Sequence, residues 1–498
     1  MSVFRQATGI DRRRLPGPCL LAGVAAIVAV APLQSAEAQN VLGPSARFAA
    51  EADAVRESVP VRRRPEFEPI GILLGDLLSA GSTTGDGSGL AVLPTPRPVN
   101  PGKLRKLDSA DGEIGLLRAG NGTSGRGLSD VLGSFVLRPR LVVDGVFDDN
   151  IFRSDQNKES DFITVLRPSL RLVSDWNNHG LILSATGAIG RYADFGSEDF
   201  EDYSVSATPK FDVTEDNVVN VNLSHSRNHE DRSGIEPQLQ GTVPSVNRFW
   251  SATTDWTYSG SAITSFLRYS FLRQDANDAG VVDRQIFDRD LHGAQWRLGW
   301  QFSPGRTVWV QPEYQLVEHR IFDVANNFDR DNQGWQFLAG MTFELSAVSF
   351  LEFGAGYVTR TFEEPTKDDY GDFAYRLRGL WNITPLVTLD LSAGRSVTVE
   401  DGVAASAAVT DEVNFRAAWD PLEQLILSAT LGYSQVNFED LPGFSREETV
   451  FRGGLNLRYL LNPNVFVEAD FKHADFDSTI ASDVYKDNQF MLRAGVEL

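Results

Sequence analysis

The chain has 498 residues, a formal net charge of −21 and a single cysteine. Only 42% of its residues are hydrophobic, and after residue 40 no stretch reaches the roughly 18 consecutive apolar residues of a membrane helix. The acidic charge makes the chain a poor partner for nucleic acid, because phosphates would be repelled.

Residues 1–38 have the features of a secretory signal peptide. Three arginines at 12–14 precede an apolar run over residues 19–33, and Ala36-Glu37-Ala38 forms an A-x-A cleavage site. A membrane anchor is the alternative, but the run is too short to span a bilayer comfortably. Cleavage after Ala38 would change the formal charge from −21 to about −23 and remove Cys19. The mature chain would then lack disulfides, thiol catalysis and Cys-based metal sites.

Residues 39–134 are rich in Gly, Pro, Ser, Ala and Arg and keep no helical or strand period. This composition predicts a mostly disordered, low-complexity N-terminal segment in the periplasm. Residues 62–80 differ, because they end in an apolar stretch over residues 70–78. That stretch is compatible with a docking segment, a lumen plug, a short strand or a sticky linker.

From residue 135 the chain alternates between apolar and polar residues in segments of about ten, joined by connections of two kinds. Short turns are predicted near residues 175–179, 214–217, 259–261, 303–306, 346–348, 384–385, 421–423 and 461–463. Long acidic loops are predicted near residues 148–160, 194–202, 229–246, 274–289, 321–332, 362–371, 399–410, 438–446 and 476–487. These connections predict about 18 strands.

The alternation predicts that each strand turns one face to lipid and the other to water. In residues 294–302, Trp296, Leu298 and Trp300 alternate with Gln295 and Arg297. An outward Arg or Lys would cost about 2–4 kcal/mol at the bilayer midplane. A soluble β-sandwich also alternates, but it does not need nine serial pairs with connections sorted by length. Residues 135–498 therefore predict an all-β fold, a transmembrane antiparallel up-and-down β-barrel in an outer membrane. The short turns and both chain termini of the barrel are expected on the periplasmic side.

Five tryptophans lie where a predicted strand meets a short turn, as expected of an aromatic girdle at one membrane interface. They are Trp176, Trp256, Trp300, Trp381 and Trp419. Trp250 and Trp335 lie near the opposite strand ends, and ordinary core tryptophans are the alternative interpretation. The last strand alternates up to Leu498 and resembles the C-terminal signal that the barrel-assembly machinery reads, although the usual last residue is aromatic.

The predicted inward face carries charges of both signs, which could position hydrated sugars or small ions. The candidate lumen-lining residues are Arg167, Arg171, Arg297, Glu313, Glu344, Glu352, Arg376, Arg378, Asp390, Arg452, Arg458, Glu468, Asp470 and Arg493, with Arg416 and Glu497 as further members. The alternative is that these charges only pair with one another and brace the wall.

No convincing catalytic or cofactor constellation is present, so we predict no enzyme, no cofactor and no defined metal site. His319 near Asp323 and His473 near Asp475 are the only pairs that could serve a hydrolase. The acidic loops offer oxygen ligands for Ca²⁺ or Mg²⁺, but their spacing matches no calcium loop. Solvated surface loops explain them better.

Residues 138–153 and 64–71 resemble segments of the putative β-barrel porin 2 family, whose members are outer-membrane β-barrels of alphaproteobacteria and relatives. The resemblance covers about residues 60–498 and brings no catalytic residues with it. It implies an association with polysaccharide secretion, and therefore periplasmic export components as partners.

The sequence thus predicts an outer-membrane channel for hydrated polar solutes or exported polysaccharide. A closed barrel that acts as a surface scaffold or adhesin, through loops such as 229–247, is the alternative. Outer-membrane lipid, lipopolysaccharide and the barrel-assembly machinery are the expected partners, and nucleic acid is not.

Overall fold

The computed structural model describes residues 134–176, 178–229, 232, 244–276, 285–322, 329–346, 349–384, 386–398, 407–439, 445–480 and 483–498. The predicted signal peptide, the N-terminal segment up to residue 133 and its apolar stretch lie outside the described residues. No helix in the described part of the chain is long and apolar enough to cross a membrane.

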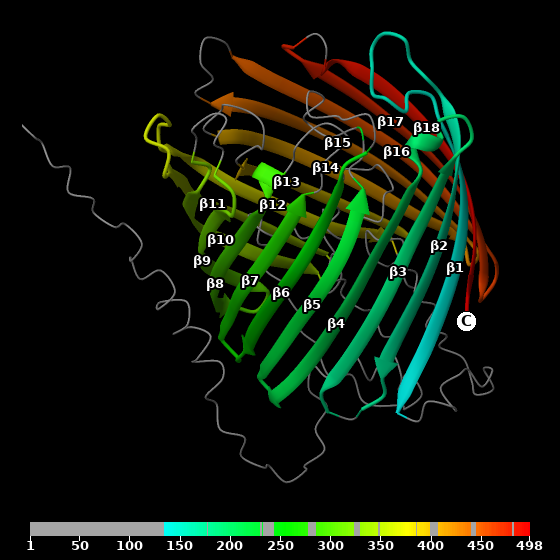
Figure 1. Ribbon diagram of the computed structural model, residues 1–498. Helices are drawn as coiled ribbons and strands as arrows, with labels where there is room; N and C mark the ends of the chain where they lie inside the picture. The colour runs from blue at the N-terminus through cyan, green and yellow to red at the C-terminus, as the bar shows by residue number, and fades with distance from the viewer. Residues whose placement is uncertain are drawn as a thin grey trace, which may run out of the picture. The chain divides into compact units, whose positions relative to one another are not determined.

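The described residues form one sheet of 18 strands, labelled in Figure 1. The strands are β1(Phe135–Asp148), β2(Asp161–Ser174), β3(Gly180–Tyr192), β4(Phe200–Thr214), β5(Asn217–His229), β6(Val246–Ser259), β7(Ile263–Ala276), β8(Arg289–Ser303), β9(Arg306–His319), β10(Asn332–Ser346), β11(Ser349–Phe362), β12(Tyr370–Thr384), β13(Val387–Thr398), β14(Ala407–Leu422), β15(Leu425–Glu439), β16(Arg446–Asn462), β17(Val465–Ser478) and β18(Tyr485–Glu497). Two short 3-10 turns, η1(Gly196–Glu198) and η3(Gln285–Phe287), lie in connections between strands.

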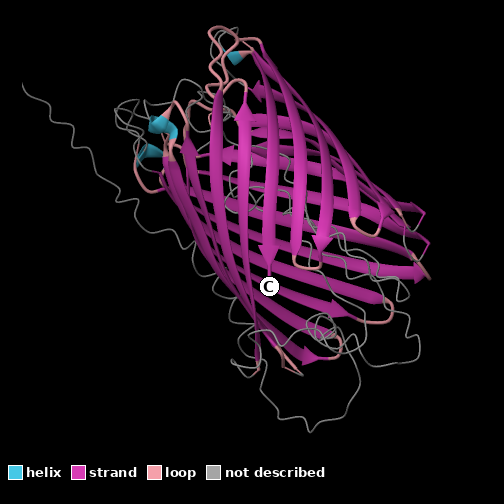
Figure 2. Ribbon diagram, turned by 90° about the vertical axis from the view of Figure 1, so that its right-hand side faces the viewer, coloured by secondary structure: helices cyan, strands magenta, loops and turns pink. Residues whose placement is uncertain are grey.

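Every strand pairs antiparallel with its neighbours in the chain, and β1 also pairs with β18. The sheet therefore closes on itself as an up-and-down barrel, which Figure 2 shows from the side. Closure removes the exposed sheet edges that could not be satisfied in a bilayer. The predicted all-β barrel of 18 strands is confirmed.

The short connections between strands lie at the eight predicted positions. Several carry a register shift beside the turn, as at Gln301/Ser303 and at Asn382/Thr384. The turn after β8 contains Gly305 with a φ of 71°, and a Cβ there would lie 3.2 Å from the Glu344 side chain and backbone. Glycine suits this position because it adopts positive φ without a steric penalty.

In many strands the two faces differ in exposure, as in β2 and β10. In β1, Leu141 and Val143 are exposed, whereas Val142 and Asp144 between them are buried. In β12, Phe373 and Trp381 are exposed, whereas Ala374, Arg376, Arg378 and Leu380 on the other face are buried. Large apolar side chains cover the exposed face of nearly every strand. Such a surface suits hydrocarbon and would be a liability in water.

Candidate functional site: the charged inner wall

The candidate lumen residues all lie on the strand face opposite the exposed apolar side chains. Arg376 and Arg378 are buried and alternate with Tyr375 and Leu377, and Arg452 follows the exposed Phe451. Because successive side chains of a barrel strand point alternately inward and outward, we infer that the charged face is the interior one. We call it the inner wall.

The first group of charges holds the seam where β18 meets β1. Asp144 of β1 is fully buried, and its carboxylate accepts from Arg493 Nε at 2.7 Å and from Arg167 Nε at 2.7 Å. Glu468 of β17 lies 3.5 Å from Arg493 and 3.2 Å from Arg458. One buried carboxylate therefore ties the last strand of the barrel to the first two. We call this group the seam clamp.

A second group lies on β8 to β11. Arg297 forms a bidentate pair with Glu352, with distances of 3.0 and 2.6 Å, and Thr342 donates to the same carboxylate at 2.7 Å. The Arg297 guanidinium also lies 4.0 Å from the centre of the Trp309 ring. The Trp309 ring also packs against the backbone at Gly354. A Cβ at this position would lie 2.3 Å from the ring, so only glycine leaves room for it. The indole is thus held between the strand backbone and a cation.

Further ion pairs extend this group along the wall. Arg376 of β12 lies 3.6 Å from Glu313 of β9, and both side chains are buried. Arg268 and Asp255 form a bidentate pair with two 2.7 Å distances between β7 and β6. The candidates outside both groups are Arg171, Glu344, Arg378, Asp390, Arg416, Arg452, Asp470 and Glu497.

The sequence-based selection missed several members of these groups. Asp144, Asp255 and Arg268 were not selected, although each occupies an inward position. Strict alternation from the exposed neighbours Val143 and Trp250 would have found the two aspartates. No sequence signal marks Trp309 as an inner-wall residue, since apolar residues dominate the outer face.

The five girdle tryptophans all lie within a few residues of a short turn. Trp300, Trp381 and Trp419 are strongly exposed, and Trp381 keeps 57% of its accessible surface. Trp256 is half-buried and donates to Asn217 Oδ1 at 3.2 Å. These positions suit a membrane interface, and the girdle remains a prediction.

The histidine pairs named as hydrolase candidates are engaged in other contacts. His473 contacts Asn488 at 2.9 Å, while Asp475 pairs with Lys486 at 2.8 Å. His319 lies 3.6 Å from Asp331, and its proposed partner Asp323 lies outside the described residues.

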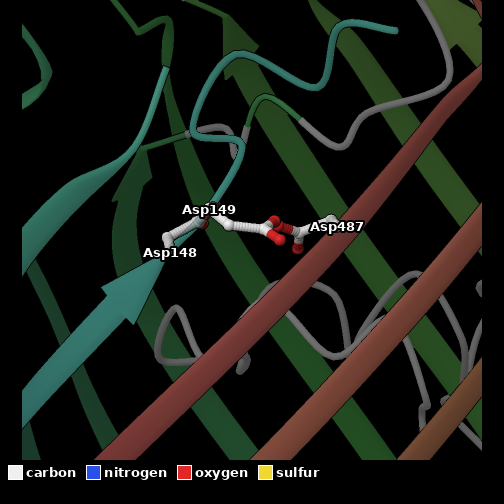
Figure 3. Close-up of side chains that lie close together, drawn as sticks. All are labelled: Asp148, Asp149 and Asp487. Atoms are coloured by element: carbon white, nitrogen blue, oxygen red, sulfur yellow. The ribbon is translucent and has the colours of Figure 1, made fainter. Parts of the chain in front are cut away.

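One group of carboxylates could hold a cation. Asp148 and Asp149, at the end of β1, lie within 4.8 Å of Asp487 of β18 (Figure 3). The Arg153 guanidinium already lies among them, 3.0 Å from Asp148 and 2.9 Å from Asp487. Asn488 donates to Asp149 through its backbone and side chain, at 2.8 and 2.7 Å. A protein cation and local donors thus satisfy this group.

A closed barrel with an apolar exterior and a charged inner wall defines an outer-membrane β-barrel protein of the porin type. The chain belongs to the putative beta-barrel porin 2 family, whose family model matches residues 128–498. The resemblance noted in the sequence is therefore confirmed. Membership of a porin family indicates a channel rather than an enzyme.

Solved outer-membrane proteins of Pseudomonas aeruginosa are similar to this chain over 73% of its length. OpdQ matches with 11% identity, 97% coverage of its own chain and a TM-score of 0.42. OccK2 (OpdF) matches with 11% identity, 98% coverage and a TM-score of 0.43. The ferric enterobactin receptor PfeA matches with 9% identity, 80% coverage and a TM-score of 0.41. None of the curated proteins matches the sequence.

Proposed function

We propose that the chain forms a water-filled channel that carries hydrated polar solutes through the outer membrane. The observation that supports this most directly is the charged inner wall inside a closed barrel of 18 strands. Barrels of 16–18 strands are wide enough to leave an aqueous lumen. Charges of both signs on such a wall interact with the hydroxyls and ionic groups of a passing solute.

Exported polysaccharide is the cargo that we favour within this class. Its support is the porin family to which the chain belongs, together with the link to secretion systems implied by the sequence resemblance. Sugar hydroxyls would find donors and acceptors in inward polar residues that keep part of their accessible surface, such as Asn456. In this proposal, residues 39–134 contact export components from the periplasmic side. The barrel-assembly machinery inserts the chain, and lipopolysaccharide surrounds it.

The channel can be tested in planar bilayers with purified, refolded protein. We expect discrete ohmic steps, and swelling of proteoliposomes in small sugars that declines as the sugars become larger. Folded barrels that give neither signal would contradict the channel and favour a scaffold. Loss of exported polymer with retention of its precursor in a deletion strain tests the cargo separately.

Glu352→Gln tests whether the wall charges face the permeating ions. The variant keeps the shape of the side chain but leaves Arg297 without a charged partner. We expect the reversal potential in a salt gradient to shift towards anion selectivity, because one negative charge leaves the wall. Glu423→Gln, in the short turn between β14 and β15, is the control and should leave the reversal potential unchanged. Equal shifts in both variants would contradict the placement of Glu352.

A further inference from the structure

The β12–β13 boundary differs from a regular barrel seam. On its β11 side, β12 is paired as far as Arg360↔Tyr370, and on its β14 side, β13 is paired as far as Thr398↔Ala408. Between β12 and β13, however, the ladder stops at Arg376↔Gly394. Residues 370–375 and 395–398 of these described strands therefore run on past the end of their shared ladder.

The burial of two valines shows on which side of the barrel wall the ends of β13 and β14 lie. By alternation, Val397 and Val409 share the outer face with the exposed Leu391 and Val413, yet they keep only 1% and 3% of their accessible surface. Both belong to one apolar cluster with inner-wall residues of the neighbouring strands. Those residues are Trp309, Leu338, Val358 and Ala374. An outer face can meet the inner wall only if the ends of β13 and β14 lie inside β12.

The hydrogen bonds of Arg360 also indicate that the end of β13 lies inside the barrel wall. Arg360, an inner-wall residue of β11 with 2% exposure, donates to the Val397 carbonyl oxygen at 3.3 Å. Arg360 also donates to the neutral amide oxygens of Asn332 and Gln315, both at 2.7 Å. The carbonyl has left the β12 ladder, so Arg360 replaces a lost backbone donor.

A bridge between side chains spans the same gap. Arg395 of β13 forms a bidentate pair with Asp411 of β14, and its Nη1 also lies 2.6 Å from Asp372 of β12. Tyr375, beside the last paired residue of β12, still reaches Asp411 at 3.1 Å. The ends of β12 and β13 therefore overlap, and side-chain contacts join them where the backbone ladder is missing. We call residues 395–398 and 407–411 the tucked end.

We propose that the tucked end narrows the lumen near the long-loop side of the barrel and sets the conductance and size limit of the channel. The proposal rests on the channel function proposed above. Arg360 tethers the tucked end to the wall, and the apolar cluster supports it. The ion-paired wall elsewhere has no such displaced element among the described strands, so loss of the tether should widen the passage at this level.

Cysteine cross-linking tests the overlap without any assay of conduction. Continuing the β12–β13 register would place Val397 opposite Phe373, whereas the overlap places it in a cluster with Ala374 and Val358. In a Cys19→Ser background, Val397→Cys should form a disulfide with Ala374→Cys or Val358→Cys on mild oxidation. It should not do so with Phe373→Cys. The opposite pattern would overturn the proposal, even if the channel conducts.

Conductance tests the consequence. Arg360→Met removes the tether at similar volume, and we expect the unit conductance to rise on the order of 1.5- to 2-fold, because it follows the open cross-section of the barrel. The disulfide between Val397→Cys and its partner should return the Arg360→Met channel to the conductance of the parent. Arg306→Met, at an exposed position near a short turn, is the matched control.

An Arg360→Met channel that folds and conducts like the parent would overturn the constriction. A parent protein that folds, as shown by an electrophoretic mobility that changes on heating, but never conducts would overturn the proposed function. It would overturn the constriction as well. The cross-linking pattern would still report the overlap in that case. The two failures are therefore distinguishable.

Discussion

The β1–β18 seam and the β12–β13 seam close the same barrel by different means. The first joins the two ends of the barrel through a continuous ladder from Arg140↔Glu497 to Asp148↔Gln489, with Asp144 clamped by two arginines beneath it. The second seam has no ladder beyond Arg376↔Gly394, and there the strand ends overlap and pack through apolar side chains. A ladder with a buried ion pair has one register. Apolar surfaces lack directional bonds and tolerate displacement more readily.

The largest effect is expected at the seam clamp. Asp144→Asn leaves Arg493 and Arg167 without the carboxylate that both contact. Removing one partner of a buried pair typically costs about 3–5 kcal/mol, because an uncompensated charge remains. We expect a loss of that size in the unfolding free energy, measured by urea titration in lipid vesicles.

The control for the seam clamp is an exposed ion pair at the rim. Asp475→Ala removes the partner of Lys486, and an exposed pair of this kind is worth about 0–1 kcal/mol. If Asp144→Asn costs no more than Asp475→Ala, the seam clamp does not hold the barrel closed.

The overlapped seam can be probed by a matched pair of valines. Val409→Ala should cost on the order of 2 kcal/mol, because it leaves a cavity in the apolar cluster between the overlapping strand ends. Val413→Ala, on the same strand face but exposed, should change the unfolding free energy little. If the ends of β13 and β14 were not tucked, both valines would face lipid, and the two substitutions would cost the same.

The smallest effect concerns the loop between β11 and β12, which borders the overlapped seam. Burial, with a contribution from Arg330, lowers the pKa of Lys367 to about 8, and Glu364 opposes that shift. Because the folded pKa lies below the usual 10.5, the folded loop binds fewer protons between about pH 8 and 10.5. Stability of the loop should therefore rise over that window and stay flat below pH 8. Since Lys367 is only partly buried, solvent screening keeps the effect small.

Protease protection of the loop, followed against pH, measures this effect. Lys367→Met should remove the rise. A parent loop whose protection does not change between pH 8 and 10.5 would show that the amine titrates as in water.

The sequence was sufficient to predict the barrel, because every strand repeats the same alternation and every second connection is a short turn. It also separates the two strand faces, as at Trp296, Arg297 and Leu298. It could not predict which charges pair. The partners of Asp144 are Arg167, in the next strand, and Arg493, at the other end of the chain. Cross-strand registers decide such pairs, and alternation alone does not encode them.

The overlap at β12–β13 was beyond the reach of the sequence for a related reason. Val397 and Val409 fit the outward apolar pattern as well as any lipid-facing residue. Only the end of the ladder and their burial show that they face another part of the protein. Alternation identifies the side of a strand but not what that side meets.

The central claim is that the charged inner wall surrounds water continuous with both sides of the membrane. The most direct measurement is the current through single refolded barrels in a planar bilayer. A change of electrophoretic mobility on heating shows beforehand that the protein is folded. We predict stable ohmic steps whose ion selectivity shifts in the Glu352→Gln variant. Folded, inserted barrels that stay electrically silent would contradict the claim.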